Sequence, residues 1–334
     1  MFQALLPRDT RAFRILVQWA FFAWIIYLGV RFWFFVRHFE SGGTAAYMSR
    51  PPGVEGFLPI GALVSLKHWV TNGIVDQVHP AALVLFLTFV AMAFLARKSF
   101  CSWLCPVGTL SEGCWKLGER IFGRNFQIWR PLDIVLRGLK YALLAFFVKI
   151  ILIDMPAQAI GGFLQAPYWA ISDVKMLHFF TNMSLTVMVV IVVLTGLSLL
   201  YRNFWCRYLC PYGALLGLIS LCSPMAVRRD TEACIGCSKC TRACPSRIDV
   251  EKKSTVINAE CTGCLSCVSS CPTEALSMKP PFYRRFLPSW SFAALVLALF
   301  FGGVGFGMLT GHWQTSLEYQ DYMRLIPMAR MMGH

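Results

Sequence analysis

The chain has 334 residues, of which 57% are hydrophobic and 14% are charged, and its formal net charge is +14. Soluble domains carry about 25% charged residues, so this composition excludes an ordinary soluble protein and indicates a membrane protein. In a membrane protein an excess of lysine and arginine reports topology, so the positive charge does not indicate nucleic-acid binding.

Five apolar stretches are long enough, or nearly so, to cross the roughly 30 Å of membrane hydrocarbon. They occupy residues 14–36, 79–96, 134–153, 180–201 and 287–309. The first is too long for the apolar core of a signal peptide, and we expect it to be a retained helix. The sequence therefore predicts an all-α polytopic membrane protein with about five transmembrane helices.

The basic residues predict how these helices are oriented. Most of the 31 lysines and arginines lie before the first stretch, between the second and third, or between the fourth and fifth. Because basic residues accumulate on the cytoplasmic side, we expect the N-terminus inside and the C-terminus outside. Fourteen cysteines also suggest thiols that stay reduced on the cytoplasmic side.

Two segments predicted on the outer side are unusually apolar. Residues 50–69 read RPPGVEGFLPIGALVSLKHW, and residues 154–169 read DMPAQAIGGFLQAPYW. Each contains Pro and Gly and is too short to span, so we expect re-entrant or interfacial segments that cover a cavity. Packing alone is the alternative explanation for such segments.

An internal repeat follows the second and fourth apolar stretches. Residues 97–110, RKSFCSWLCPVGTL, align without gaps with residues 202–215, RNFWCRYLCPYGAL. We call these the first and second CxxxCP segments. Cysteines at i and i+4 share one face of a helix, and the Pro and Gly that follow fit a helix break with exposed N–H groups.

The repeat predicts a four-cysteine site near a pseudo-symmetry axis. Its members are Cys101, Cys105, Cys206 and Cys210. Four thiolates there would suit an iron–sulfur cluster, zinc or, with fewer thiolates, Cu(I). Structural cysteines, or thiols that form reversible disulfides, remain the alternatives.

Residues 226–281 contain two runs of the bacterial ferredoxin type, each Cys-x2-Cys-x2-Cys-x3-Cys-Pro. Two such runs hold two [4Fe–4S] clusters, and the fourth cysteine of each run ligates the other cluster. We therefore assign Cys234, Cys237, Cys240 and Cys271 to cluster 1. Cluster 2 receives Cys261, Cys264, Cys267 and Cys244. Zinc sites or a disulfide framework are the alternatives, but zinc favours two separated cysteine pairs.

These features predict four segments along the chain. Residues 1–110 form a first membrane half with its CxxxCP segment, and residues 111–225 form the second half. Residues 226–281 form an inserted, cytoplasmic, ferredoxin-like α+β module with two [4Fe–4S] clusters. Residues 282–334 form the last transmembrane helix and a periplasmic tail.

The double CxxxCP repeat, followed by a double ferredoxin run, resembles the membrane polyferredoxin family over residues 14–310. Members include NapH-type quinol dehydrogenase subunits and NosR-type and CcoG-type proteins. The resemblance implies a multi-pass protein of the bacterial cytoplasmic membrane that moves electrons between the quinone pool and a redox partner in a respiratory pathway. That partner would be a cytochrome or an iron–sulfur subunit on either side of the membrane. The four CxxxCP cysteines match the positions of the family's motif.

A quinone site would fit the apolar outer segments, because such pockets have apolar walls and a few convergent polar groups. Quinol oxidation releases protons, which suits histidine and a buried carboxylate. The predicted catalytic residues are Glu55, His68 and His79, with Lys67 and Asp154 as further polar groups. The alternative is that these groups are interfacial and solvated.

We do not expect haem b, although histidines predicted near the outer side are potential haem ligands.

Two other functions remain open from the sequence. A CcoG-like copper reductase or metallochaperone would hold copper at the CxxxCP thiols and would show no quinone dependence. A thiol redox sensor would signal through a disulfide within one CxxxCP segment, and oxidation would alter a partner without turnover.

Overall fold

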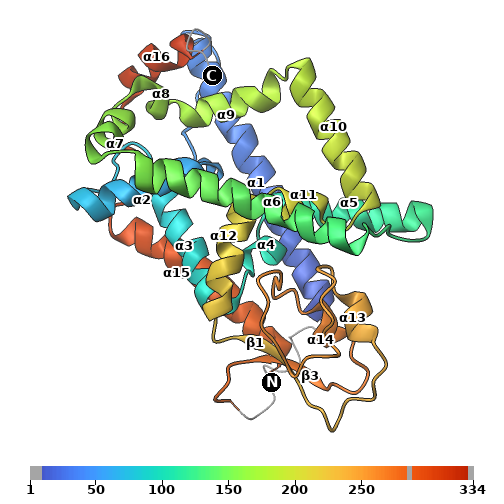
Figure 1. The fold of residues 1–334 in the computed structure, drawn as a ribbon. Coiled ribbons are helices and arrows are strands. Elements are labelled where there is room, and N and C mark those ends of the chain that lie inside the picture. The colour runs from blue at the N-terminus through green and yellow to red at the C-terminus, as the bar shows by residue number, and fades with distance from the viewer. Residues whose placement is uncertain (1–9, 284–287, 330–334) are drawn as a thin grey trace, which may run out of the picture. The chain divides into compact units, whose positions relative to one another are not determined.

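The computed structural model describes residues 10–283 and 288–329 (Figure 1). Parts of the predicted N-terminal segment and tail, residues 1–9 and 330–334, lie outside the described residues, as do residues 284–287. The described part of the chain is mostly helical, as the apolar stretches predicted.

The helices of the first 222 residues occur in this order: α1 (Thr10–Glu40), η2 (Pro52–Phe57), α2 (Pro59–Asn72), α3 (Pro80–Ala96), α4 (Phe100–Trp103), α5 (Pro106–Phe122), α6 (Arg130–Val148), the π-helix η3 (Lys149–Asp154), α7 (Ala157–Leu164), α8 (Pro167–Ala170), α9 (Ser172–Thr181), α10 (Leu185–Leu200), α11 (Phe204–Tyr208), α12 (Pro211–Ile219) and η4 (Ser220–Cys222). The later elements are β1 (Ala226–Arg229), α13 (Lys239–Ala243), β2 (Thr255–Val256), α14 (Ser266–Ser269), β3 (Leu276–Lys279), α15 (Ser289–Leu309) and α16 (Tyr319–Met328).

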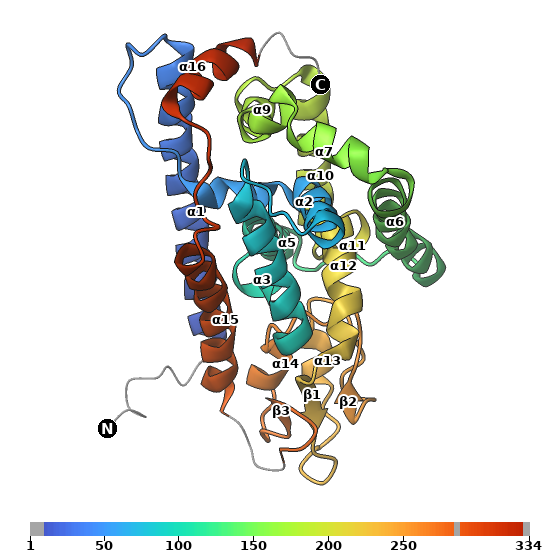
Figure 2. The same cartoon turned by 90° about the vertical axis from the view of Figure 1, so that its left-hand side faces the viewer.

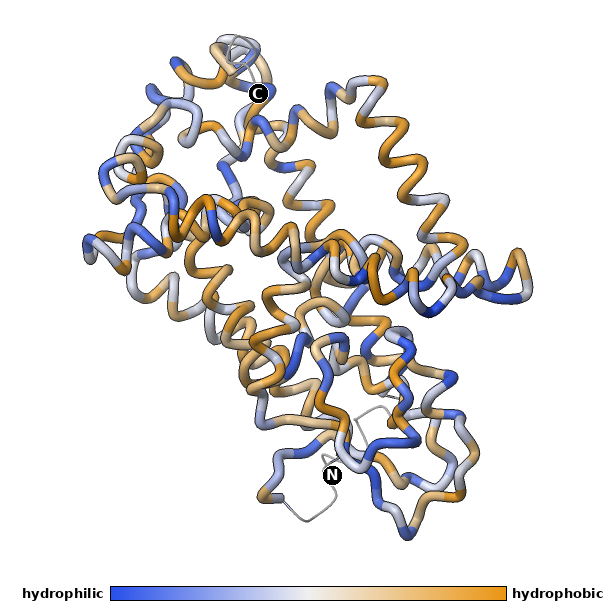
Figure 3. The backbone as a smooth tube through the Cα atoms, in the orientation of Figure 1, coloured by the Kyte–Doolittle hydropathy of each residue, from blue (hydrophilic) through white to orange (hydrophobic). Residues whose placement is uncertain are grey.

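Two helices, α1 and α15, are each long and apolar enough to cross a membrane. Two pairs of segments, Arg130–Asp154 with Ala157–Leu164 and Ser172–Thr181 with Leu185–Leu200, pass the same test together but bend by 105° and 77°. Figure 3 shows one of their members, α10, as a mostly apolar tube. The described residues thus provide two spans, or up to four if each bent pair is one span. The protein is a membrane protein, and the number five stays a prediction.

The bend after η3 has a local cause. Pro156 is the N-cap of α7, and the residue before a proline is disfavoured in the helical conformation. The π-helix ends there, and Lys67 Nζ donates to the carbonyl groups of Ile151, Leu152 and Met155 at distances of 3.0, 3.0 and 2.5 Å. A lysine at a helix C-terminus satisfies carbonyl groups that have no partner within the helix.

The chain divides into two compact units, each made of three separate stretches. Unit 1 contains residues 1–22, 89–144 and 191–300, so it includes both CxxxCP segments and the ferredoxin module. Unit 2 contains residues 23–88, 145–190 and 301–334, so it includes both apolar outer segments. The units group residues by contact in space, and the four segments expected from the sequence stay a prediction.

The ferredoxin module of unit 1 contains a small antiparallel sheet with strand order β2-β1-β3. Val227 of β1 pairs with Val256 of β2 and with Met278 of β3, and all three side chains are buried. The short helices α13 and α14 pack against each other, and α14 also contacts β3. The cysteine runs are therefore mounted on a small α+β framework (Figure 1).

The core of unit 2 joins the C-terminal part of α1 to α9 and α16. Phe35 and Phe39 of α1, Val174 of α9, and Tyr322 and Ile326 of α16 are all buried in one hydrophobic cluster. Figure 2 shows α16 lying against the C-terminal end of α1. The apolar segment 50–69, expected as a re-entrant or interfacial loop, folds mainly as the helices η2 and α2.

Candidate iron–sulfur centres

The two ferredoxin runs are built from the same backbone turns. The left-handed residues are Gly236, Ser238 and Arg247 in the first run and, each 27 positions later, Gly263, Leu265 and Glu274 in the second. Their φ angles all lie between 53° and 67°. Bulky residues rarely adopt this conformation, so its repetition at matched positions marks a turn that both loops require.

These turns direct backbone N–H groups at cysteine sulfur atoms. The N–H of Gly236, together with Arg229, lowers the pKa of Cys234. In the second run burial raises the pKa of Cys261, and the N–H of Gly263 opposes that rise. Hydrogen bonds to sulfur favour the thiolate that a cluster needs and tune its potential. The loops therefore fit iron–sulfur ligation in a way that their spacing alone does not show.

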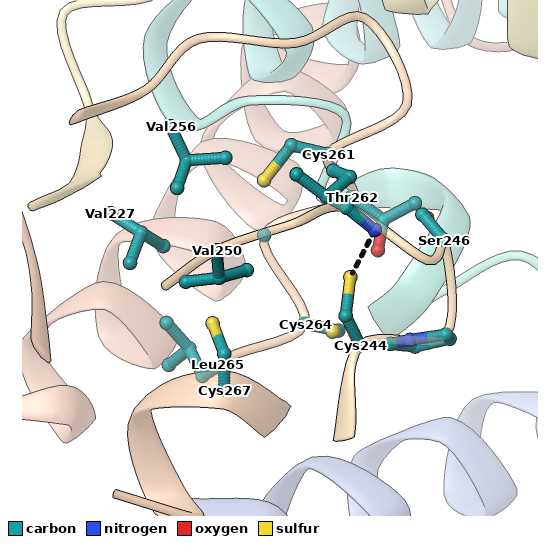
Figure 4. A pocket seen from close by; sticks show the side chains of 13 residues that line it. Val227, Cys244, Ser246, Val250, Val256, Cys261, Thr262, Cys264, Leu265 and Cys267 are labelled. Carbon is teal, nitrogen blue, oxygen red and sulfur yellow. Dashed lines mark hydrogen bonds between the residues drawn. The ribbon is translucent and has the colours of Figure 1, made fainter. Parts of the chain in front are cut away.

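The four cysteines assigned to cluster 2 line a single pocket. Figure 4 shows the sulfur atoms of Cys244, Cys261, Cys264 and Cys267 around it. The other lining residues are Val227, Pro245, Ser246, Ile248, Val250, Val256, Thr262, Gly263 and Leu265. Burial, reinforced by neighbouring thiols, raises the pKa of Cys244 to about 12. Buried thiols of this kind become thiolates when a metal centre replaces the proton, so the donor set fits a cluster.

The cysteines assigned to cluster 1 lie in more open surroundings. Cys240 is buried on α13, which packs against α14, the helix that carries Cys267. Cys234, Cys237 and Cys271 are half-buried. The module thus presents one pocketed set of thiols and one more exposed set.

All fourteen cysteines are free thiols. Within residues 10–283 and 288–329, no three histidine, cysteine or acidic side chains are arranged as ligands to a single metal ion. A [4Fe–4S] cluster binds each of its four thiolates to a different iron, so its cysteines stand farther apart than the ligands of one ion. The arrangement is therefore compatible with clusters and does not provide a preformed single-ion site.

Each CxxxCP segment places its second cysteine at the start of a helix. Cys105 is the N-cap of α5 and Cys210 is the N-cap of α12, and proline occupies the first helical turn in both. The N–H of Gly213 donates to Cys210 Sγ at 3.2 Å. A helix N-terminus favours negative charge, which stabilises a thiolate there.

The expected helix break is present, but it falls inside the motif. α4 ends at Trp103 and α5 begins at Pro106, so Cys101 and Cys105 do not share one continuous helix face. The same holds for α11 and α12 in the second segment. The prediction of a shared face was wrong because proline begins a new helix directly after the second cysteine.

The four CxxxCP thiols lie close enough to influence one another. Burial raises the pKa of Cys101 to about 12 and that of Cys105 to about 11, and Cys210 adds to both rises. Burial also raises the pKa of Cys206, and repulsion from the other three thiols adds to this effect. Four half-buried thiols gathered in this way are a donor set that a thiolate-bound metal centre would stabilise.

The first CxxxCP segment is hydrogen-bonded to the backbone that carries Cys261 and Cys264, two of the ligands assigned to cluster 2. Ser102 Oγ donates to the carbonyl oxygen of Thr262 at 2.7 Å, and Trp103 Nε1 donates to that of Gly263 at 3.2 Å. Ser102 and Trp103 lie between Cys101 and Cys105, and their acceptors lie between Cys261 and Cys264. Side chains between two predicted ligands of one centre therefore contact the backbone between two predicted ligands of the next.

The second CxxxCP segment contacts the backbone next to Cys244, the ligand of cluster 2 that comes from the first ferredoxin run. Arg207 Nη1 donates to the carbonyl oxygen of Ser246 at 2.9 Å, two residues after Cys244. Asp133 of α6 holds this arginine through two 2.9 Å hydrogen bonds, and Tyr208 donates to the same carboxylate at 2.5 Å. Sequence reasoning missed Ser102, Trp103 and Arg207, although their positions inside the motif were visible.

In unit 2 the predicted outer site is only partly assembled. Glu55 and His79 are buried, and Glu55 Oε1 lies 3.3 Å from His79 Nδ1. Arg50 and Asp173, which the sequence analysis did not single out, belong to the same network. Arg50 lies 2.8 Å from Glu55 and 2.7 Å from Asp173. A buried arginine between two carboxylates neutralises charges that would be costly alone.

The other predicted outer residues lie apart from this network. His68 Nδ1 is hydrogen-bonded to the carbonyl group of Ile74 at 3.0 Å. Lys67 caps the π-helix as described above. Asp154 pairs with Lys149 at 2.6 Å on an exposed surface. The structure thus brings Glu55 and His79 together and leaves His68, Lys67 and Asp154 in separate surroundings.

Comparison with known families agrees with this geometry. A family model described as a 4Fe-4S binding domain matches residues 78–125 and 183–229, which contain the two CxxxCP segments. A 4Fe-4S dicluster domain matches residues 226–272. No solved structure shows a significant match to the chain. The matched regions and the sites described above define an iron–sulfur protein of the ferredoxin type.

Curated relatives identify the family. The chain is 45% identical over 333 residues, 98% of its own length and 93% of the relative's, to YccM of Escherichia coli, which is provisionally named as an electron transport protein. It is 28% identical over 160 residues, 46% of this chain and 49% of the relative, to the ferredoxin-type protein NapH of Haemophilus influenzae. A methylamine utilization ferredoxin-type protein, MauN of Methylorubrum extorquens, is 28% identical over 205 residues, 57% of this chain and 62% of MauN. The chain belongs to the membrane-associated, ferredoxin-type polyferredoxin family and is an iron–sulfur electron transport protein.

Proposed function

We propose that this protein carries electrons along three iron–sulfur sites arranged in series. Cys101, Cys105, Cys206 and Cys210 would hold a [4Fe–4S] cluster in addition to clusters 1 and 2, and each cluster would supply one-electron redox chemistry. The proposal is carried by the contacts of both CxxxCP segments with loops of cluster 2. Cluster 2 is then the middle site of the series.

The protein side chains have distinct tasks in this series. Ser102 and Trp103 fix the spacing between the CxxxCP site and one loop of cluster 2. Arg207, held by Asp133, fixes the spacing to the other loop. Because the acceptors in these contacts are neutral backbone carbonyl groups, the contacts restrain the ligand-bearing loops without placing a carboxylate next to the cysteines of cluster 2. The more exposed cluster 1 is the end of the series at which a soluble redox partner would exchange electrons.

The electrons at the other end would be exchanged with the quinone pool, as the resemblance to quinol dehydrogenase subunits suggests. Glu55 and His79 are the supporting residues, because a buried carboxylate beside an imidazole suits a proton that accompanies an electron. Glu55→Gln should lower the rate of quinol-dependent cluster reduction while dithionite reduces the clusters as before. Equal quinol rates in the two proteins would remove the quinone site from this network.

We place the protein in the bacterial cytoplasmic membrane, with the ferredoxin module in the cytoplasm and the C-terminus in the periplasm. The distribution of lysine and arginine along the chain supports this orientation. Cysteine-reactive labelling from either side of sealed vesicles would test it, since Cys222 is exposed and precedes the module.

The assignment of the third cluster is tested by iron and sulfide content. Three clusters predict about twelve irons per chain, and two predict about eight. We expect Cys206→Ser to lower the content by about four irons, with Cys114→Ser as a control that leaves it unchanged. An iron content of about eight in the parent protein, unaltered by Cys206→Ser, would contradict the assignment. Copper bound by these thiols would favour the copper reductase instead.

A further inference from the structure

A buried charge cluster joins Lys98, three residues before Cys101, to Glu260, the residue before Cys261. Glu260, the residue before Cys261, accepts a hydrogen bond from Lys140 Nζ at 2.6 Å, and Lys98 Nζ lies 3.9 Å from its other oxygen. The side chains of Lys98, Lys140 and Glu260 are 5%, 0% and 11% exposed. Two cations and one carboxylate leave a net positive charge in a region that water does not screen.

Lys98 is the member of this cluster that is nearest in sequence to a CxxxCP cysteine. It lies three residues before Cys101, in the turn between α3 and α4, where the left-handed Arg97 redirects the chain. Arg97 is anchored by donating to the carbonyl groups of Ser220 and Val256, which fixes the turn against both membrane and ferredoxin segments. The ammonium group is thus held in place by the fold and by Glu260.

Electrostatics supports this placement. Burial alone would lower the pKa of Lys98, but Glu260 and the thiols of the CxxxCP site outweigh burial and raise it. The ammonium group of Lys98 and, to a smaller extent, that of Lys140 lower the pKa of Cys101 in turn, against the larger effect of burial. The second CxxxCP segment has no equivalent cation, because the position that matches Lys98 is Asn203.

We propose that Lys98, held by Glu260, is a positioning charge that raises the reduction potential of the centre bound by the CxxxCP cysteines. Reduction adds one electron, and therefore one negative charge, to that centre. A fixed buried cation nearby stabilises the reduced form more than the oxidised form. Glu260 acts in the opposite sense, and it lies beside a ligand of cluster 2. The pair would therefore set the relative potentials of two adjacent centres, and this inference rests on the proposed cluster at the CxxxCP site.

The test is an EPR-monitored redox titration of the full-length protein, with iron content measured on each sample. Lys98→Met should shift the reduction equilibrium of the CxxxCP centre at least tenfold toward the oxidised form, which is about 59 mV for a one-electron couple. Lys98→Arg keeps the charge and should shift it less than threefold. Glu260→Gln should shift it toward the reduced form. The control is Lys116→Met, because Lys116 is more exposed and pairs with Glu112.

Each outcome bears on a different claim. Full iron content with an unchanged titration in Lys98→Met would overturn the role of Lys98 and leave the third cluster standing. If Lys98→Met loses iron, Glu260→Gln decides: a shift toward the reduced form supports the proposal, and no shift overturns it. A parent protein with about eight irons would overturn both the third cluster and this inference.

Discussion

Gly108 occupies the point where the first CxxxCP segment turns into α5. A Cβ atom at this position would lie 2.2 Å from the carbonyl oxygen of Cys101. A Cβ atom at the matching Gly213 would lie 3.8 Å from the carbonyl oxygen of Cys206, and its nearest neighbour would be Cys210 Sγ at 3.4 Å. The repeat in sequence is therefore not an exact repeat in space. The first half brings its two cysteine-bearing turns closer together than the second half does.

This difference predicts unequal effects of the same substitution. Gly108→Ala should lower the free energy of unfolding by about 1–3 kcal/mol, because the backbone carbonyl cannot move freely. Gly213→Ala should cost less than about 1 kcal/mol, because only ordinary contact is added. Thermal unfolding in detergent, followed by circular dichroism, measures both. Equal losses in the two variants would contradict a closer backbone approach at Gly108 than at Gly213.

Glu112 predicts a pH dependence at the residue scale. It accepts hydrogen bonds from Arg14 at 2.7 and 2.8 Å and from Lys116 at 2.6 Å. Burial opposes ionisation, but these cations outweigh it and lower the pKa of Glu112 to about 2, from an ordinary value of 4.5. Because the folded-state pKa is the lower one, the stabilisation is complete above about pH 4.5 and is lost as the pH falls toward about 2.

Glu112→Gln should therefore lower the free energy of unfolding at pH 7 by about 3 kcal/mol, because it leaves Arg14 buried without its carboxylate. The difference between the two proteins should shrink as the pH falls below 4.5. Glu119→Gln is the matched control on the same helix, since Glu119 is 42% exposed and pairs with Arg202 at 3.2 Å. A difference for Glu112→Gln that stays constant with pH would contradict the ion-pair explanation.

At the element scale, α16 is part of the core of unit 2. Its N-terminus has a reciprocal capping box between Glu318 and Asp321, and its buried face consists of Tyr322, Leu325 and Ile326. Tyr319, at its first position, donates or accepts a 2.8 Å hydrogen bond with His38 at the end of α1. The segment that the sequence describes as a periplasmic tail thus folds back on the first long helix.

Ile326→Ala should destabilise unit 2 by about 2–5 kcal/mol, because Ile326 is fully buried. Met328, which is 42% exposed on the same helix, provides the control Met328→Ala. Limited proteolysis should cut the Ile326 variant in residues 310–329 sooner than it cuts the control. Identical digestion of the two variants would mean that α16 is not anchored through this face.

Several elements could be predicted from the sequence because their signals are local. The long apolar runs of α1 and α15 and the cysteine spacing of the ferredoxin module depend only on neighbouring residues. The bends of the α6–α7 and α9–α10 pairs were not predicted, since hydropathy averages over a bend. Residues 50–69 were expected to be a re-entrant or interfacial segment with proline and glycine punctuation, and the helices η2 and α2 were not foreseen, because Pro52 and Pro59 begin helices.

At the scale of the whole molecule, the sequence predicted the family, and the comparisons confirm it. Iron–sulfur ligation could be predicted from the cysteine motifs because ligand spacing is local. What the sequence did not reveal is which loops meet: Ser102 with Thr262, Arg207 with Ser246, and Lys98 with Glu260 are separated by many residues. Such pairs depend on tertiary packing, and a single sequence contains no direct signal for them.

The central claim is that the CxxxCP cysteines hold a redox centre adjacent to cluster 2. The most direct measurement is the EPR spectrum of the fully reduced protein, in which nearby paramagnetic centres broaden and split each other's signals. We predict a spin–spin interaction in the parent protein that disappears in Cys101→Ser, while the two ferredoxin clusters keep their own interaction. A Cys101→Ser spectrum identical to that of the parent would contradict the account.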